Sequence, residues 1–282
     1  MIKIITKFTL VAILLITSIA KAQNFQGQAF YESKTNVEGA FKLDSPSMTE
    51  EMKKRMLESM KKAFEKSYVL TFNKTESNYE EEQKLEAPTP GIGGGMMVKM
   101  ENYTDGKIYK NIKEKVTLSE LDFLGKEFLV TDSLTTYKWN LESESKKIGD
   151  YTCYKATYVI PVSEKDKQDF ANFQKKQSES KTQFMMMDEP KDRLITVWYT
   201  PEIPISQGPA EYWGLPGLIL EANFDKTVIL CSKIILNPKE KVNIKKPKIG
   251  KKVTKEEYER LMENQFEQMK DGDGVIKIEI QR

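Results

Sequence analysis

Apolar and polar residues alternate along most of the chain, which predicts a mainly β protein. Residues 151–160 show this best, because even-numbered positions fall on one strand face and odd-numbered positions on the other. Strand patterns also occur at residues 24–35, 68–72, 75–82, 107–112, 123–130, 137–141, 194–199, 218–224, 227–236 and 275–280. We expect a single curved antiparallel sheet or half-barrel.

Two stretches have the spacing of amphipathic helices instead. One follows Ser47-x-x-Glu50 and the other Thr254-x-x-Glu257, both of which are capping boxes. Their apolar residues are Met52, Met56, Met60 and Phe64 in the first helix and Tyr258, Leu261, Met262, Phe266 and Met269 in the second. We expect two helices packed on the sheet. The methionines of the first could form a soft-metal face, but core filling is the favoured interpretation.

The first 22 residues have the character of a signal peptide. Lys3 and Lys7 precede an apolar stretch, 8–19, that is short for a membrane span, and Ala20-Lys21-Ala22 is a cleavage signal. Cleavage after Ala22 would leave a chain exported to the periplasm or secreted. No Cys stands at the cleavage point, which argues against a lipoprotein. No later apolar run reaches the roughly 20 residues of a spanning helix.

Residues 23–282 are then expected to form a single β-rich domain with a mobile insertion at about 163–192. The insertion is polar, with a weak apolar stripe from Phe170 and Phe173, and it ends in Phe184-Met-Met-Met187. This composition indicates a partly helical excursion between two strands. A methionine-lined lid over a groove is the functional alternative.

The amino-acid composition excludes several kinds of catalytic and metal site. The chain contains no His, which removes Ser-His-Asp and Cys-His catalysis and most zinc and copper(II) sites. Subtracting the three Lys of the leader from 44 basic residues leaves 41 against 42 acidic ones, a net charge of about −1. Nucleic-acid binding therefore has no global electrostatic support. We expect no cofactor, no metal site and no catalytic residues.

The two cysteines, Cys153 and Cys231, both lie in strand patterns. An exported protein with an even number of cysteines can pair them, so a cross-sheet disulfide is one interpretation. The sequence does not set the distance between the two Cα atoms, and free thiols are the other interpretation.

The densest group of backbone-shaping residues is 208–217, Gly-Pro-Ala-Glu-Tyr-Trp-Gly-Leu-Pro-Gly. It predicts a structural corner, from which Leu218, Leu220 and Phe224 then enter the core. Leu215-Pro216-Gly217-Leu218 fits a type II turn, with Pro216 fixing φ and Gly217 supplying φ > 0. Gly214 is expected to allow a close backbone approach.

The same region resembles a known family. Gly214-Leu-Pro-Gly-Leu-Ile219 is similar to the motif of the GLPGLI family, exported bacterial proteins of unknown biochemical role. The supporting residues are Lys147, Ile148, Tyr151, Cys153, Lys155 and Ala156, then Trp198, Tyr199 and Thr200 with Ile203 and Pro204, and finally Gly208 and Pro209. The resemblance covers about residues 130–236, and it implies no catalytic residues. The insertion at 163–192 departs from the pattern, and Cys231 lies outside these motifs.

These features favour an exported, non-enzymatic envelope protein that binds an apolar ligand, a lipid or a partner protein in a groove between sheet and helices. By analogy of fold, the order of elements is similar to that of LolA-like lipoprotein carriers. The candidate ligand or partner surface consists of Met56, Met60, Tyr212 and Trp213.

Three alternatives stay open. One is a structural or assembly accessory of outer-membrane transport machinery. Another is a hydrolase without His, for which Glu202, Glu211 and Glu221 beside the corner are the candidate acids, although each is also explained as a solvated side chain. The Lys-rich stretch 238–252 is expected to be a solvated loop, with contact to anionic lipid headgroups as its alternative.

Overall fold

The structure is a computed structural model that describes residues 25–37, 49–82, 107–123, 125–179 and 189–269. Several predicted features lie outside the described residues: the signal segment 1–22, the cap residue Ser47, the Phe184-Met-Met-Met187 stretch and the strand at 275–280.

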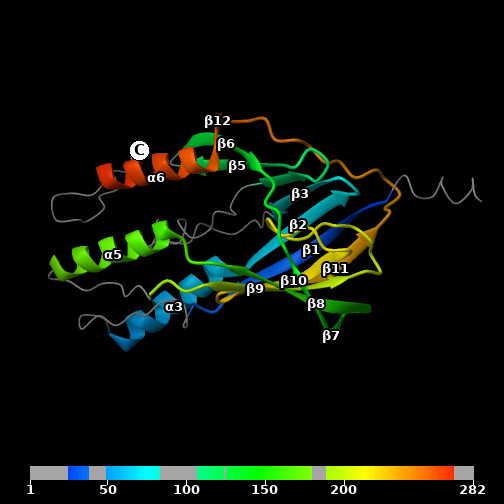
Figure 1. Ribbon diagram of the computed structural model, residues 1–282, viewed down its shortest axis with the longest axis horizontal. Coiled ribbons are helices and arrows are strands. Elements are labelled where there is room, and N and C mark those ends of the chain that lie inside the picture. The colour runs from blue at the N-terminus through cyan, green and yellow to red at the C-terminus, as the bar shows by residue number, and fades with distance from the viewer. Residues whose placement is uncertain (1–24, 38–48, 83–106, 124, 180–188, 270–282) are drawn as a thin grey trace, which may run out of the picture.

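One open, curved sheet contains all the strands of the described residues (Figure 1). Its order is β12-β6-β5-β4-β3-β2-β1-β11-β10-β9-β8-β7. The strands are β1 (Gln26–Thr35), β2 (Lys66–Asn73), β3 (Glu76–Glu81), β4 (Lys107–Asn111), β5 (Val116–Phe123), β6 (Lys126–Ser133), β7 (Asn140–Ile148), β8 (Tyr151–Ile160), β9 (Arg193–Thr200), β10 (Leu218–Phe224), β11 (Thr227–Leu236) and β12 (Lys251–Val253). The predicted mainly β fold is confirmed.

The sheet differs from the prediction at one edge. β12 pairs with β6 in parallel, whereas the other neighbours are antiparallel. The strand predicted at 123–130 corresponds to β6 but begins three residues too early, because β5 ends at Phe123 and Gly125, with φ of 77°, lies in the turn before β6. The sequence pattern did not predict β5. Its Leu118 and Leu121 point to opposite faces, so neither face of this strand is uniformly apolar.

Strand register defines two faces of the β1–β6 half of the sheet. We call the face of Lys110, with Ser77 beside it, the inner face, and the face of Tyr109, with Asn78 beside it, the outer face. The largest hydrophobic cluster covers the inner face, where its buried members include Ala29, Tyr31, Tyr68, Leu70, Phe72, Tyr79 and Ile108. The largest cluster of this half therefore lies on the inner face, and a smaller buried cluster of Tyr109, Leu118 and Leu129 lies on the outer face.

Among the described residues, three helices accompany the sheet: α3 (Glu50–Phe64) and α6 (Lys255–Met269), which match the two expected packing helices, and α5 (Glu164–Glu179) in the insertion. They extend beyond the same end of the sheet in Figure 1. The N-cap of α3 is Thr49, two residues after the predicted Ser47, because the Thr49 hydroxyl accepts the Met52 N–H (3.2 Å).

The predicted capping box of α6 is confirmed. Thr254 N donates to Glu257 Oε2 (2.9 Å), and Glu257 N donates to Thr254 Oγ1 (3.1 Å). Tyr258 packs with Phe128 and Val130 of β6 in a separate cluster. Register places both β6 residues on the inner face, so α6 covers that face.

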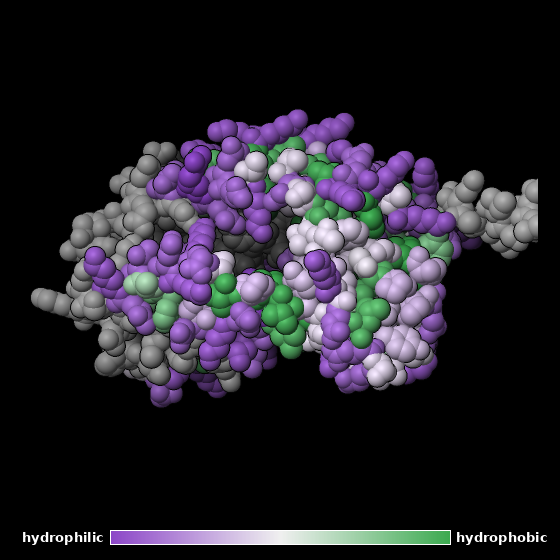
Figure 2. Space-filling model, in the orientation of Figure 1, coloured by the Kyte–Doolittle hydropathy of each residue, from purple (hydrophilic) through white to green (hydrophobic). Residues whose placement is uncertain are grey.

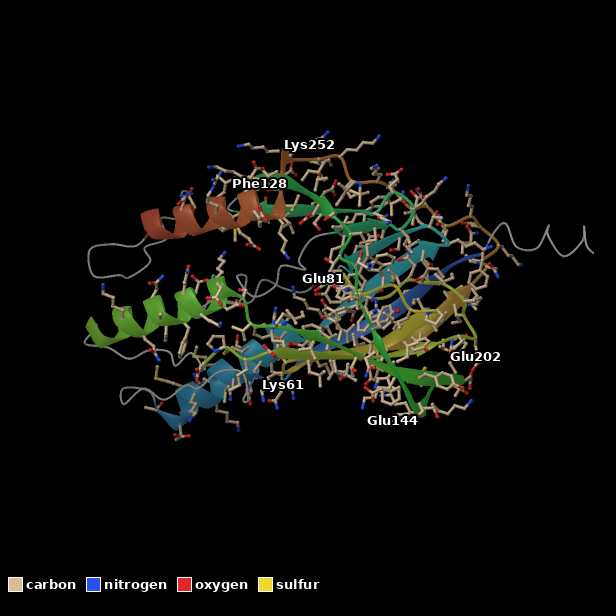
Figure 3. All side chains as sticks on the ribbon, viewed as in Figure 1. Lys61, Glu81, Phe128, Glu144, Glu202 and Lys252 are labelled. Atoms are coloured by element: carbon tan, nitrogen blue, oxygen red, sulfur yellow. The ribbon has the colours of Figure 1, made fainter. Side chains whose placement is uncertain are left out.

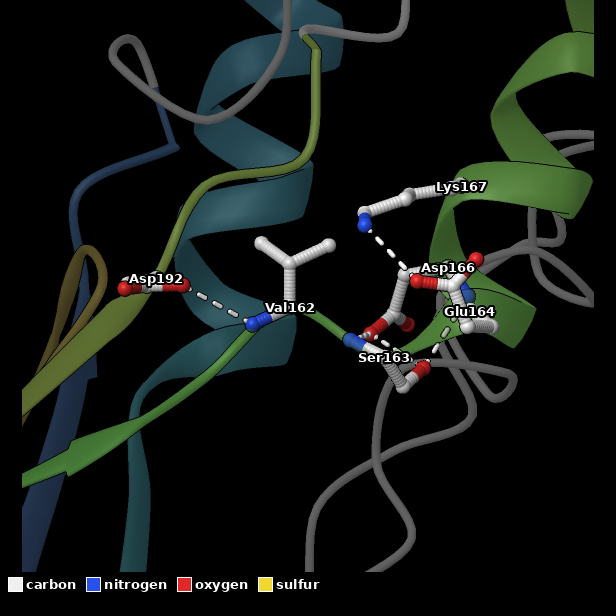
Figure 4. A network of polar contacts seen from close by, with 6 residues as sticks. All are labelled: Val162, Ser163, Glu164, Asp166, Lys167 and Asp192. Atoms are coloured by element: carbon white, nitrogen blue, oxygen red, sulfur yellow. Dashed lines mark hydrogen bonds and ion pairs between the residues drawn. The ribbon is translucent and has the colours of Figure 1, made fainter.

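The segment after β8 begins a helix rather than a tight hairpin, and Figure 4 shows why. Ser163 Oγ accepts the Asp166 N–H (3.0 Å), while the Asp166 carboxylate accepts the Ser163 N–H (2.9 Å). The Ser163 hydroxyl also donates to the Asp166 carboxylate (2.6 Å), and this bond, together with the one from the Ser163 N–H, lowers the pKa of Asp166. Asp192 Oδ1 accepts the Val162 N–H (2.9 Å) and so holds the two ends of the excursion together. The partly helical prediction for 163–192 is thus matched by α5.

The corner at 208–217 is present, but the predicted type II turn is wrong. Gly214 has the positive φ, 98°, and Gly217 does not. A Cβ on Gly217 would lie 2.2 Å from Thr200 O, whereas one on Gly214 would come no closer than 3.6 Å to Trp139. The two glycines therefore have each other's predicted roles: Gly214 supplies the unusual backbone angle, and Gly217 allows the close approach to β9.

These roles predict different costs of substitution. Gly217→Ala should lower the free energy of unfolding by about 3 kcal/mol or more, because the Thr200 carbonyl must move. Gly214→Ala should cost about 1–2 kcal/mol, the strain of positive φ in an open space. Urea unfolding of both variants measures this order, and a larger loss for Gly214→Ala would show that the assignment is wrong.

Candidate functional site

A buried lysine holds the corner against the sheet. Lys110 of β4 is fully buried, and its Nζ donates to Gly208 O (2.7 Å), Ala210 O (2.6 Å) and Tyr212 O (3.1 Å). Three acceptors match the three N–H bonds of an ammonium group. Lys110 therefore satisfies carbonyls that a segment without regular structure cannot satisfy by itself. Ala210 has φ of 47°, a strained value that these contacts stabilise.

Burial also perturbs the protonation of this lysine. It lowers the pKa of Lys110 to about 7, while the negative charge of Glu211 acts in the opposite direction. A second tether lies next to the first, because Ser77 Oγ donates to Gln207 Oε1 (2.9 Å) and Ser77 is opposite Lys110 in the β3–β4 register. β3 and β4 therefore bind the corner through two adjacent buried side chains.

Two indoles join the corner to the segment between β6 and β7. Trp139 Nε1 donates to Trp213 O (2.8 Å), and Trp213 Nε1 donates to Thr135 O (2.6 Å). Tyr212 lies in a group of aromatic rings with Tyr137 and Trp139. Because Tyr212 is only 3% exposed, the structure places this candidate partner residue inside the fold.

The candidate methionines belong to a different part of the molecule. Met60 is buried and Met56 half-buried, and both pack with Val37 and Phe64 in a small cluster between α3 and the end of β1. This placement agrees with core filling. The structure therefore does not bring Met56 and Met60 together with the Tyr212 rings.

The two cysteines are free thiols in the structure, so the disulfide left open by the sequence is not formed there. Both are buried in the main core cluster. Burial raises the pKa of Cys153 to about 11 and that of Cys231 to about 12. Both thiols are therefore protonated at neutral pH and weak as nucleophiles.

The three candidate carboxylates have separate surroundings. Glu202, labelled in Figure 3, accepts the Thr152 N–H (2.8 Å). Glu221 pairs with Lys146 Nζ at 2.6 Å, and Glu211 is exposed. Glu202 and Glu221 thus have structural partners of their own, whereas a shared acid/base role would require the two carboxylates to act on one substrate.

An open groove of about 930 Å³ lies on the outer face. Its floor consists of Val116 and Leu118 of β5 with Leu129 and Thr131 of β6, which the register places on one face. Residues 246–248 and 252–254 border the groove, and the segment leads into α6. Since α6 packs on the inner face, this groove is not between the sheet and the packed helices, where the sequence predicted one.

The Lys-rich stretch is a mostly exposed loop over residues 238–250, as predicted, and it is also attached to the outer face. Glu120 Oε1 accepts the N–H groups of both Lys248 (3.0 Å) and Ile249 (3.3 Å). Asn78 Nδ2 donates to Lys245 O (3.2 Å). These bonds to β3 and β5 fix the segment as one wall of the groove.

Charged side chains of both signs line this groove: Lys246, Lys248, Lys252, Glu114 and Glu257. Lys246 Nζ lies 3.2 Å from Glu114 Oε2, and Glu257 caps α6. Within the described ranges, Lys248 and Lys252 have no carboxylate partner. Two exposed positive charges therefore border an apolar floor.

Sequence reasoning missed Lys110, although one signal was present. In the strand 107–112, Ile108 and Lys110 alternate with Tyr109, so the lysine shares a face with an apolar residue. A lysine on an apolar strand face needs buried acceptors. Nothing in the sequence indicated that those acceptors would be the carbonyls of the corner, about a hundred residues away.

Comparison with known proteins gives a family match and distant structural neighbours. Residues 139–221, which include the corner, match a family described as "Protein of unknown function (Porph_ging)". No curated protein matches the chain. No helix of the described residues has the length and apolar character needed to cross a membrane.

Among solved structures, the chain is similar to PNGF-II in two crystal forms, at 12% identity and TM-scores of 0.47 and 0.46. Both alignments cover 86% of this chain but only 33% and 34% of PNGF-II, so the chain spans about a third of that protein. LprF from Mycobacterium bovis aligns over 80% of this chain and 90% of LprF, at 8% identity and a TM-score of 0.26.

Removing the buried ammonium should be costly. Lys110→Met leaves three buried carbonyls without a donor and should lower the free energy of unfolding by at least about 3 kcal/mol. The control is Lys107→Met in the same strand, which removes an ion pair with Glu80 (3.1 Å) and should cost less than about 1 kcal/mol. Equal unfolding midpoints in denaturant for the two variants would contradict the role of Lys110.

The shifted pKa of Lys110 predicts a pH dependence. Its value of about 7 lies below the roughly 10.4 of an unfolded lysine, so between these pH values the unfolded chain binds a proton that the folded chain has released. This lysine should therefore make stability rise with pH from 7 upward, by at most about 1.4 kcal/mol per pH unit. The ¹³Cε resonance of Lys110 should titrate with a midpoint near pH 7. A midpoint near 10 would exclude the shift.

Proposed function

We propose that the protein is an exported, non-enzymatic binding protein whose outer-face groove holds an apolar ligand or lipid. The observation that carries the proposal is the groove itself: strand residues form an apolar floor, and its volume of about 930 Å³ lies within the range of roughly 300–1,000 Å³ of small-molecule sites. Export rests on the predicted signal peptide and is part of the proposal.

The construction of the groove supports this role. Leu118 and Leu129 are almost fully buried in the sheet, so the floor is preformed. Glu120 fixes the opposite wall through two backbone N–H groups. A preformed site loses little conformational entropy when a ligand binds, which favours affinity.

A partner-binding accessory is the alternative, and it would use exposed apolar side chains. Val159 and Leu194 form one exposed cross-strand pair, and Val228 and Leu230 lie together on β11. In the view of Figure 2, apolar residues are interspersed with hydrophilic ones. The groove is the more specific feature, because it combines concavity with an apolar floor.

The proposal predicts that the chain from Gln23 binds a neutral apolar dye such as Nile red, with enhanced fluorescence. Thr131→Trp should reduce this binding by about tenfold or more, since an indole at this exposed position would fill the groove. Thr136→Trp, at an exposed position that does not line the groove, is the matched control. Absent binding, or equal binding by both variants, would overturn the proposal.

A further inference from the structure

We infer that the outer-face groove accepts a long-chain carboxylate, with its head group at Lys248 and Lys252 and its hydrocarbon chain along the apolar floor. This inference rests on the proposed function and adds to it the charge and the orientation of the ligand.

The position of Lys252 relative to the floor gives the first argument. The parallel register of β12 and β6 pairs Lys252 with Leu129, and the same register on the other side pairs Leu129 with Glu120. Lys252 therefore continues the row of outer-face positions that contains the apolar floor. A charged end and an apolar surface thus follow each other along the sheet, which is the arrangement that an amphiphile needs.

The balance of charge gives the second argument. Lys246 is paired with Glu114, and both side chains are about half exposed, at 48% and 55%. Lys248 and Lys252 are exposed and have no carboxylate partner in the part of the chain that the structure describes. The wall therefore presents two positive charges that a carboxylate can neutralise.

The same residues disfavour other ligands. A neutral lipid chain would leave both lysines without a counter-charge. A polyanion such as a nucleic acid would come close to Glu114 and Glu257, which border the same groove, and like charges repel. A single carboxylate on an apolar chain can pair with Lys248 and Lys252 while its hydrocarbon chain covers the apolar floor.

The test compares 11-(dansylamino)undecanoic acid with its methyl ester at pH 8, where the acid is ionised and the ester has no charge. The native chain should bind the acid about tenfold more tightly than the ester, because two exposed ion pairs contribute to one complex and not to the other. Raising the salt concentration should weaken binding of the acid and leave the ester unchanged.

The variant is Lys248→Gln with Lys252→Gln, and the control is Lys251→Gln. Lys251 precedes Lys252 in β12 and does not line the groove. The double variant should bind the acid no more tightly than the ester, with the ester affinity retained, whereas Lys251→Gln should behave as the native chain. Thermal unfolding of all variants checks that these exposed substitutions leave the fold intact.

The outcomes separate the two proposals. Equal affinities of the native chain for acid and ester would overturn the carboxylate assignment and leave the apolar groove in place. A preference for the acid that survives in the double variant would also overturn it, because the charge would then be recognised elsewhere. If neither probe binds, the proposed function itself fails.

Discussion

The interaction on which the structure depends is the contact of one ammonium group with three main-chain carbonyls. Lys110 projects from β4, an interior strand of the sheet, and binds a segment without regular secondary structure. Water would otherwise solvate those carbonyls, and the corner could not cover the apolar inner face. Burial of this charge is costly and lowers the pKa of Lys110, and the three N–H···O=C hydrogen bonds offset part of that cost while they satisfy the buried carbonyls.

Neighbouring residues of β4 connect this core to the candidate binding site. Lys110 points to the inner face and organises the corner, while Tyr109 points to the outer face and packs with Leu118 and Leu129. Both leucines belong to the groove floor. The groove is thus built on the reverse side of the inner-face core, so its floor is a packed part of the sheet although the groove is open to solvent.

The sequence predicted most strands, because period-two alternation and flanking turn residues are local signals. Prediction from the sequence failed where the surroundings of a residue are formed by residues far away along the chain. Ile219 lies on the opposite face from Leu218 and Leu220, yet it is fully buried, because a second cluster covers that face of the sheet. Likewise, the composition of 238–252 resembles a solvated loop, and only the positions of Asn78 and Glu120 on the outer face attach it to the sheet. Tyr212 and Trp213 were predicted to contact a ligand or partner, but their neighbours in the fold come from a segment about 75 residues earlier.

The central position of β1 has a consequence for how the chain folds. β1 pairs with β2, which follows soon after it, and with β11, which is made near the end of the chain. Tyr31 Oη donates to Ile219 O across 188 residues. A chain synthesised from its N-terminus therefore holds one edge of β1 unpaired until β11, about 190 residues later, has emerged, and contacts of such high sequence separation make folding slow. During that interval the open edge is a template for pairing with another chain, so a chaperone that shields β1 would benefit this protein more than one that protects its helices.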